Sequence, residues 1–527
     1  MKRISRPDLA AALMLALAAG VWTWVGFASL RPAILDRSTF NYWFEGDAPH
    51  TYMQMSGTSG KYHGRTSRHP LFSLVSGVPV SKARHLTGLD RETAVSVWMV
   101  AVSALWALLF FAVLRRVGLQ TGSAVVFGSL GIVSAATVFS LPVPGHYVLG
   151  SATMLAAPLV VAAHREDDWR APTWLLVCVA AGTLAITTTN WAAGLALLLV
   201  AAGFRRGALL AAISLLTVLA LFALQKYLVP DAAGFLLPSG ESGFVLHALG
   251  GGSPPRLSVI FLGSIVMPPI QETVAPVWLS IQRAIPGSGS VLNAVATLLW
   301  LALLVATFRW WRVWSKRPIG QVIALILASQ VLLQLVFGFE TFLYAIHWAP
   351  MLIALVALGA VAGSIRVFTI VGAALTVLLA INNFAAFAEA RALAIQRYDD
   401  HTAFVGAVRE AMDTRAPIVH GSPRDDRLER RSTSIPDSDD LRIFWRLGPE
   451  VDKRDLEMTG WTLYHDLWTL DRIEALKEQG ARYFMSTYRH GLDESKPFID
   501  QLALHYHTVA RADGYVIIDL TRPATPG

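Results

Sequence analysis

Long apolar runs separated by short polar segments fill most of the chain before residue 383. A helix needs about 20 consecutive apolar residues to cross the hydrocarbon core of a bilayer, and most of these runs approach that length. The pattern therefore predicts about eleven membrane-spanning helices. The runs cover residues 9–30, 93–114, 122–141, 147–163, 173–187, 191–203, 207–228, 291–308, 319–337, 342–362 and 367–381.

The first run follows a basic start, Lys2 and Arg3, a combination that also occurs in cleaved signal peptides. Its apolar stretch continues for about 22 residues, which is enough to span a bilayer. We therefore expect an uncleaved anchor with its amino terminus inside.

Two neighbouring runs, 173–187 and 191–203, are short and are separated by Thr188-Thr189-Asn190. They can form a hairpin of two helices or one long helix with a polar kink. Basic residues concentrate in the cytoplasmic loops of membrane proteins. With the hairpin, the basic segments 205–206 and 309–317 lie on the same side as the other basic loops, whereas a single helix would place them outside. The charge pattern therefore favours the hairpin, the amino terminus inside and the carboxyl terminus outside.

Composition agrees with a membrane protein. Hydrophobic residues make up 54% of the 527 positions and charged residues only 15%, whereas soluble proteins carry about 25% charged residues; the mean hydropathy is +0.48. A net charge of +7 is more often a sign of basic cytoplasmic loops than of nucleic-acid binding in such a chain. These values exclude a nucleic-acid enzyme, a disulfide-stapled secreted domain and a disordered protein. The single cysteine, Cys178, cannot form an internal disulfide.

Two domains are predicted. Residues 1–383 form a transmembrane domain with large outer loops at about 31–91 and 229–290, and residues 384–527 carry 19 of the 44 lysines and arginines. The predicted fold is mainly α: a polytopic helical membrane protein with a small α/β extracytoplasmic domain at its carboxyl end. In that domain we expect helices at 385–412 and 471–479, strands at 416–420, 482–487, 508–512 and 515–520, and a hairpin turn at Asp513-Gly514.

The first outer loop concentrates the chemistry of the chain. Ion-coupled transporters usually place carboxylates or histidines within their spans, but the spans here contain few ionisable groups. Between residues 40 and 70, by contrast, acids come first, aromatic residues surround them and bases follow. The loop contains Glu45, Asp47, Tyr52, Lys61, Arg65, Arg68 and His69.

Four features resemble the GT-C class of membrane glycosyltransferases, which includes the protein O-mannosyltransferases and the lipid A aminoarabinose transferases. The layout is also similar, with many spans, a large first outer loop and a soluble carboxyl-terminal domain. The features are Asp47 followed by Tyr52, the element His69-Pro70-Leu71 that opens a short apolar helix to about Val80, the segment 142–150 (PVPGHYVLG), and the segment 340–350 (ETFLYAIHWAP).

The resemblance implies an inverting transfer at the outer face of the membrane. A sugar leaves a polyprenyl-phosphate-linked donor and joins the hydroxyl group of a glycan, lipid or protein acceptor. By position, Asp47 is the general base and Glu45 its backup, since removing a hydroxyl proton needs a positioned carboxylate. The leaving phosphate needs cationic donors, for which Lys61, Arg65, Arg68 and His69 are candidates. The other expected substrate-binding residues are Tyr52, His146, Glu340, Tyr344 and His347.

The chain departs from the family pattern at two places. Many relatives pair a second acid with the first-loop aspartate, where this chain has Gly46 and Ala48, and many carry an acid where it has Gly145-His146. The second catalytic acid is therefore open, and so is the metal: no cofactor is implied with certainty, and a divalent cation remains a candidate. The expected partners are the lipid-linked donor, the acceptor and membrane lipids, with no nucleic acid.

Simpler interpretations remain beside these. Asp47 can cap a helix that begins at Ala48-Pro49, and Arg65 and Arg68 can snorkel to the membrane interface. Glu340, Tyr344 and His347 share one helix face and can form a structural set.

Two other functions also stay open: a transporter or flippase for a lipid-linked saccharide, and a non-catalytic scaffold. Composition and short loops favour a multi-pass protein of the bacterial inner (plasma) membrane.

Overall fold

The computed structural model describes most of the chain. The described residues are 5–35, 42–58, 61–165, 170–235, 252–273, 278–338, 340–411, 418–422, 441–444, 457–464, 468–486, 496–512 and 515–524. They divide into two compact units. The first comprises Met1–Arg31, Phe44–Gln271 and Leu279–Arg391, and the second comprises Pro32–Trp43, Glu272–Trp278 and Ala392–Gly527.

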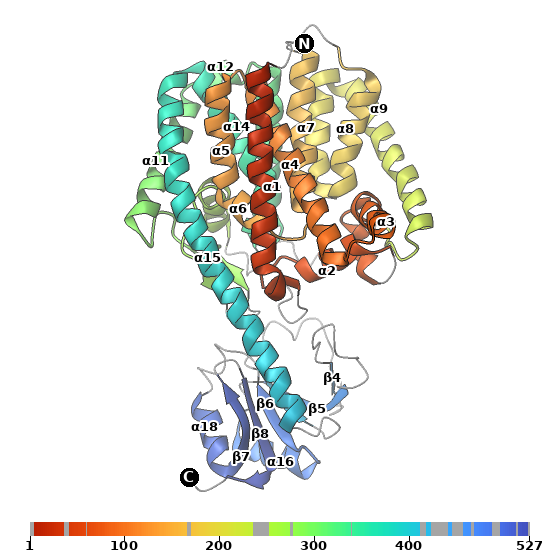
Figure 1. The fold of residues 1–527 in the computed structure, drawn as a ribbon, viewed down its shortest axis with the longest axis vertical. Helices are drawn as coiled ribbons and strands as arrows, with labels where there is room; N and C mark the ends of the chain where they lie inside the picture. Colours follow the sequence, from red (N-terminus) through yellow and green to blue (C-terminus); the bar gives the residue numbers. More distant parts are fainter. Residues whose placement is uncertain are drawn as a thin grey trace. The chain divides into compact units, whose positions relative to one another are not determined.

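The first unit is a bundle of apolar helices. Eight helices in the described part of the chain are long and apolar enough to cross a membrane, and several of them lie side by side in Figure 1. A polytopic helical membrane protein is thereby confirmed. The main helices of this unit are α1 (Arg6–Leu35), α4 (Arg91–Val117), α5 (Thr121–Val133), α6 (Ala135–Ser140), α7 (Tyr147–Arg165), α8 (Thr173–Ile186), α9 (Trp191–Leu228), α11 (Val291–Phe308), α13 (Pro318–Val336), α14 (Ala345–Ala362) and α15 (Ile365–Ala411).

Each predicted apolar run falls on one of these helices, and the lower count comes from how the structure divides them. Runs 191–203 and 207–228 share α9, whose backbone leaves helical geometry at Gly203, with φ 74° and ψ 173°. The run 122–141 is broken at Ser134 into α5 and α6. The short α5 and α8 have 13 and 14 residues and fall below the length of a full span.

The predicted hairpin is present. A short 3-10 turn, η4 (Thr188–Asn190), joins α8 to α9, and the two helices pack against each other. A Cβ atom at Gly194 of α9 would lie 2.7 Å from the Cα of Ala180 in α8, so the helices touch through their backbones. One long kinked helix is therefore excluded.

Polar side chains satisfy the backbone where the bundle is irregular. At the break between α5 and α6, Asn383 of α15 donates from Nδ2 to the carbonyl oxygens of Val133 and Ile265. In hydrocarbon, a freed carbonyl group needs such a partner. Asn382 and Asn383 had marked the end of a span in the sequence, but α15 runs straight through them to Ala411. The predicted helices 367–381 and 385–412 are thus one helix, inside which the predicted domain boundary falls.

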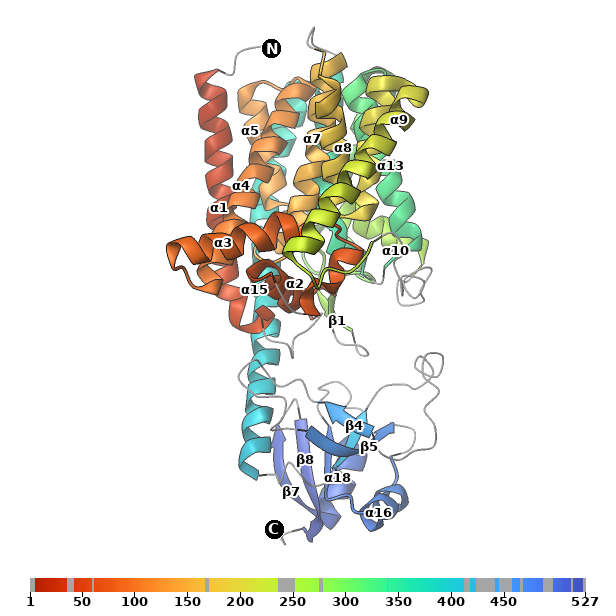
Figure 2. The same cartoon turned by 90° about the vertical axis from the view of Figure 1, so that its right-hand side faces the viewer.

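The first large loop is mostly helical and lies at one end of the bundle, and Figure 2 shows α3 lying across the direction of the bundle helices. The helix expected to end near Val80 continues to Thr87, where Gly88 closes it with φ 72°. The segments are α2 (Ala48–Ser56), the 3-10 helix η2 (Lys61–Ser67), the π-helix η3 (Ser73–Gly77) and α3 (Val78–Thr87).

The second loop contains α10 (Ser253–Ser258), η7 (Val259–Gly263), β1 (Gln271–Glu272) and β2 (Leu279–Ser280). Two short helices, α12 (Trp311–Trp314) and η8 (Thr341–Tyr344), precede α13 and α14.

The second unit contains a small α/β domain, as predicted. Its sheet has six strands in the order β4-β5-β3-β6-β8-β7, with β3 parallel to both β5 and β6 and the other pairs antiparallel. Buried side chains of α16 and α18, such as Ile473 and Leu502, pack on apolar residues of β6 and β8. The turn at Asp513-Gly514 lies outside the described residues. The elements are β3 (Ile418–Ser422), β4 (Leu441–Phe444), β5 (Glu457–Tyr464), α16 (Leu470–Glu478), β6 (Tyr483–Ser486), α18 (Lys496–His505), β7 (Tyr506–Ala512) and β8 (Tyr515–Pro523).

Close helix packing gives a first prediction. A Cβ at Gly359 of α14 would lie 2.8 Å from the Cα of Thr307 in α11, so Gly359→Val forces these helices apart. We expect a loss of about 1–3 kcal/mol in the free energy of unfolding, measured as a lower melting temperature of the purified protein in detergent. The matched control is Gly182→Val, because nothing lies within 4 Å of a Cβ at Gly182. Equal melting temperatures for the two variants would contradict this packing.

Candidate functional site

The first-loop carboxylate, Asp47, is buried at the start of α2 with only 3% of its surface exposed. It occupies the N-cap position, followed by proline in the first turn, but its side chain makes no capping hydrogen bond. The side chain forms an ion pair with Arg65 instead, through Oδ2. The other oxygen, Oδ1, is also buried and has no hydrogen-bond partner among the described residues. The cap interpretation is therefore wrong for the side chain.

Arg65 belongs to η2, and a set of buried hydrogen bonds fixes the segment around it. Thr66 donates from Oγ1 to the carbonyl oxygens of His63 and Ala233. The ring of His63 hydrogen-bonds through Nδ1 to the hydroxyl of Ser73 at 2.8 Å. Burial lowers the pKa of the Arg65 guanidinium. Because η2 is held this way, the guanidinium stays beside Asp47.

The His69-Pro70-Leu71 element docks on the α8–α9 hairpin. The amide of Leu71 donates to the carbonyl of Ala185, and the amide of Thr188 donates to the carbonyl of Arg68. Gln225 of α9 clamps the same stretch: its Nε2 donates to the carbonyl of Pro70, and its Oε1 accepts from the amide of Leu74. This docking fixes the position of His69.

Two buried imidazoles stack at this junction. The rings of His69 and His146 lie 3.4 Å apart at an interplanar angle of 30°, and His69 Nδ1 lies 3.0 Å from the carbonyl oxygen of Ile186. Burial lowers the pKa of both rings well below the ordinary value, and the neighbouring Arg65 lowers it further. Burial therefore favours the neutral form of both rings.

Aromatic residues connect the stack to the late motif. Tyr147 follows His146, with ring centroids 4.0 Å apart, and its ring also packs on those of Tyr344 at 5.7 Å and His347 at 6.0 Å. Tyr147 and Tyr344 lie close enough to Arg65 to influence its pKa. The segments 142–150 and 340–350 therefore meet the first loop.

A pair of carboxyl groups, those of Glu45 and Glu340, lies in the same region. Glu45 Oε2 accepts a hydrogen bond from the backbone N–H of Glu340 at 3.3 Å. Glu340 is buried and accepts hydrogen bonds from the hydroxyl of Ser280 and the amide of Phe342. Burial, then the charge of Glu340, raises the pKa of Glu45 to about 8. Arg65 and Arg68 lower it by a smaller amount, so Arg68 also lies within electrostatic reach of Glu45.

The backbone at Glu45 is strained. Phe44 and Glu45 have φ values of 50° and 61°, in the left-handed region that residues other than glycine rarely adopt. Phe44 is anchored by its ring, which packs on Phe139 and Phe342 at 5.5 and 4.9 Å. Strain of this kind persists where the surroundings dictate the conformation, and it is common at functional sites. Here the strained turn carries Glu45 to Glu340 immediately before Asp47.

Two predicted residues stand apart. Tyr52 lies on α2, but the charges that influence it are those of Glu92, Arg91, Asp90 and Arg84, and burial raises its pKa to about 12. It therefore belongs to the contact with the start of α4 rather than to the cluster around Asp47. The side chain of Lys61 lies outside the described residues, so its assignment to phosphate binding stays a prediction.

The structure also adds residues that the sequence did not single out. Tyr147 lies in the segment 142–150, although the sequence analysis did not single it out. Gly150 and Thr187 lie beside His347 and Asn190. Ser280, which binds Glu340, had no signal in the sequence. No group of three or more histidine, cysteine, aspartate or glutamate side chains in the described ranges could hold a metal ion; the divalent cation stays a prediction.

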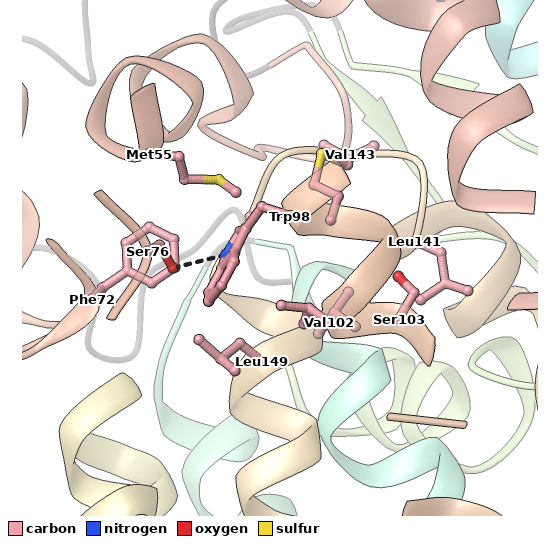
Figure 3. Close-up of a pocket in the computed structure, with 12 residues that line it drawn as sticks. Met55, Phe72, Ser76, Trp98, Val102, Ser103, Leu141, Val143 and Leu149 are labelled. Carbon is pink, nitrogen blue, oxygen red and sulfur yellow. Dashed lines mark hydrogen bonds between the residues drawn. The ribbon is translucent and has the colours of Figure 1, made fainter. Parts of the chain in front are cut away.

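A small apolar pocket adjoins the polar cluster. Figure 3 shows Met55, Trp98, Val102 and Leu149 facing it, with the Trp98 indole donating to the hydroxyl of Ser76. Phe72 and Gly145 also line the pocket, and the Phe72 ring lies 5.9 Å from that of His146. Charged and apolar surfaces therefore meet within a few residues at this end of the bundle.

Comparison with known proteins gives structural matches only. No protein-family model and no curated protein matches the chain. ArnT from Cupriavidus metallidurans matches over 98% of this chain and 99% of its own, at 12% identity and a TM-score of 0.47 when bound to undecaprenyl phosphate, and at 13% and 0.47 in the apo state. The arabinofuranosyltransferase AftD from Mycobacteria matches over 90% of this chain and 35% of its own, at 14% identity and a TM-score of 0.41.

ArnT and AftD are GT-C glycosyltransferases, the class that the sequence resembles. Because all three TM-scores lie below 0.5, the function proposed below rests on this chain's own residues.

The Glu45–Glu340 pair gives a prediction for the pH dependence of stability. Since folding raises the Glu45 pKa from 4.5 to about 8, the folded state holds an extra proton between these values. The stabilisation of the folded state by this proton is complete below pH 4.5 and is lost as the pH rises through about 8. Glu45→Gln, which is permanently neutral, should flatten the decline in melting temperature across this window.

The control for this prediction is Glu92→Gln, since Glu92 lies in an exposed ion pair with Arg31. That variant should keep the wild-type pH dependence. A Glu45→Gln protein whose melting temperature declines as steeply as that of the wild type would show that Glu45 is ionised in the folded state.

Proposed function

We propose that the chain is an integral-membrane glycosyltransferase. It moves a sugar from a polyprenyl-phosphate-linked donor to an acceptor hydroxyl group at the outer face of the membrane, with inversion at the anomeric carbon. The observation that carries the proposal is the Asp47 carboxylate, buried, paired with Arg65 and left with one unpartnered oxygen. A buried charge without full hydrogen bonding is costly, so this arrangement supports a role with a ligand.

In the proposed reaction, Asp47 Oδ1 accepts the proton of the acceptor hydroxyl as its oxygen attacks the anomeric carbon. The bond from that carbon to the phosphate oxygen breaks, and its electron pair leaves with the polyprenyl phosphate. Attack from the face opposite the phosphate inverts the anomeric configuration in a single displacement. A positioned base contributes about 10²–10⁴-fold to such a step.

Arg65 has two successive partners in this proposal. Before the donor binds, its guanidinium neutralises Asp47. A donor phosphate offers a stronger, bidentate partner for arginine, and Arg68 is close enough to share the charge. Moving Arg65 toward the phosphate releases Asp47 to act as a base, so the carboxylate is freed when the substrate is in place.

The apolar pocket supports a lipid-linked donor. Its lining of Met55, Phe72, Trp98 and Leu149 is apolar, the kind of surface that a hydrocarbon chain packs against, and the nearby Arg65 and Arg68 suit a phosphate. A ligand with both parts joined is a polyprenyl phosphate. We further propose that this face is extracytoplasmic, in a bacterial inner membrane, as the distribution of basic loops favours.

One observation favours transport as the second candidate. A transporter of lipid-linked saccharides predicts polar residues within the spans, and Gln330, Gln334 and His347 are buried there with unpartnered side-chain atoms. The two functions differ in outcome: a transporter changes the side on which the lipid-linked sugar lies, whereas a transferase changes the mass of the acceptor.

The test is complementation of a deletion strain, with cell-surface glycans and glycolipids profiled by mass spectrometry. We expect one sugar mass to vanish in the deletion, to return with the wild type and to stay absent with Asp47→Asn at equal expression. Asparagine keeps the size of the side chain and removes the base. Transfer in isolated membranes should fall by about 10²–10⁴-fold.

Asp90→Asn is the matched control, because Asp90 is an exposed residue that caps α4 through Thr93; it should restore the profile. Full restoration by Asp47→Asn would refute Asp47 as the base. A sugar-bearing lipid that accumulates on one side of the membrane, with no acceptor mass lost, would favour the transporter.

A further inference from the structure

Two buried polar side chains inside the bundle carry atoms that have no hydrogen-bond partner among the described residues. Asn190 of η4 and His347 of α14 have 0% and 1% of their surface exposed. Both side-chain atoms Oδ1 and Nδ2 of Asn190, and Nε2 of His347, make no hydrogen bond to any part of the chain that the structure describes. Such groups are rare in folded proteins, and within a membrane they commonly mark functional positions.

The unpartnered groups converge on Gly150 of α7. A Cβ atom at Gly150 would lie 2.8 Å from Asn190 Nδ2, 3.0 Å from His347 Nε2 and 3.6 Å from Thr187 Oγ1. Glycine lowers helix stability relative to alanine, yet here any side chain would collide with these atoms. We call the residues Gly150, Thr187, Asn190 and His347 the Gly150 node. Two separate segments, residues 187–190 and α14, thus supply polar groups that approach α7 closely because residue 150 has no side chain.

The chemistry of the node selects a hydroxyl group. The Asn190 amide offers two donors and an acceptor, and the His347 nitrogen is a donor or an acceptor according to its tautomer. A hydroxyl group both donates and accepts, so it can satisfy the two side chains together. The node itself holds no cationic side chain, unlike the Arg65 and Arg68 region, and so it is unsuited to phosphate.

The node adjoins the proposed catalytic site. Thr187 Oγ1 lies 3.3 Å from Nδ1 of His69, and the His347 ring lies 6.0 Å from that of Tyr147. His69 and Tyr147 in turn lie within the electrostatic reach of Arg65. A sugar held beside Asp47 and Arg65 would therefore lie near the unpartnered polar atoms of the node.

We propose that the Gly150 node binds one hydroxyl group of the transferred sugar and so contributes to the choice of donor. The inference rests on the proposed function, since it names a subsite of the same site. It assigns the sugar to the node and the phosphate to Arg65 and Arg68. The competing occupant is an ordered water bound in place of a sugar hydroxyl. If water occupies the node, the affinity for the lipid should not depend on the sugar that it carries.

The experiment measures the affinity of the purified full chain in nanodiscs for undecaprenyl phosphate, alone and carrying mannose, glucose, galactose or arabinose. We expect the wild type to bind at least one sugar-bearing lipid more tightly than the bare lipid. Asn190→Leu should weaken the affinity for that sugar-bearing lipid about tenfold, which corresponds to the loss of one buried hydrogen bond. The affinity for the bare lipid should stay unchanged. Ser214→Ala is the control, because Ser214 is buried in α9 and bonds to its own helix.

Folding is checked by melting temperature. Because Asn190→Leu removes an unpartnered buried amide, its ligand-free melting temperature should equal or exceed that of the wild type. If this variant does not fold, Gly150→Ala replaces it, since the added methyl displaces Asn190 and His347 from their positions and retains both polar side chains.

A sugar-dependent gain that survives both Asn190→Leu and Gly150→Ala overturns the inference, and so does a wild type that shows no gain. Failure of the proposed function is distinguishable, because the wild type would then bind neither the bare lipid nor its sugar-bearing forms.

Discussion

The ion pair between Asp47 and Arg65 is the interaction on which the candidate site depends. A carboxylate that is 3% exposed at the end of an apolar bundle can stay ionised only if a cation lies beside it. The surrounding bonds serve that pairing: Thr66 ties η2 to the second loop, and Gln225 ties the following stretch to α9. Without such anchors, a loop of this length could not hold a guanidinium against one carboxylate.

The bundle accommodates the site by breaking regular structure and repairing it with side chains. The interruption at Ser134 frees the carbonyl of Val133, which Asn383 binds from α15. The strained turn at Phe44 and Glu45 is held by aromatic packing and by Glu340. At the Gly150 node the repair is incomplete, since the Asn190 amide and Nε2 of His347 have no partner in the part of the chain that the structure describes. These unsatisfied atoms lie close to the candidate site, because Thr187 of the node contacts His69.

Much of the fold could be predicted because it depends on local pattern. Apolar runs of spanning length predicted the helices, and charge distribution predicted the α8–α9 hairpin. The end of a span at Asn382-Asn383 was misread because local polarity cannot show that these side chains bind the backbones of Met267 and Ile265. The union of α15 with the following helix was missed for the same reason.

The site was predictable only where a motif marked it. Asp47, Arg65, Arg68, His69, His146, Glu340, Tyr344 and His347 do come together, whereas Tyr52 lies apart because the turn of α2 directs it to the start of α4. The pairing of Glu45 with Glu340 joins residues 295 positions apart. No spacing rule reaches that far, and the resulting pKa depends on burial, which only the assembled structure reveals.

The most direct measurement is a structure of the full chain in nanodiscs with undecaprenyl phosphate bound, by cryo-electron microscopy. The account predicts density for the phosphate against the guanidinium of Arg65, with Asp47 released from its ion pair and the hydrocarbon chain beside Trp98 and Leu149. A phosphate bound elsewhere, with the Asp47–Arg65 pair intact, would contradict the proposal that this pair is the catalytic centre.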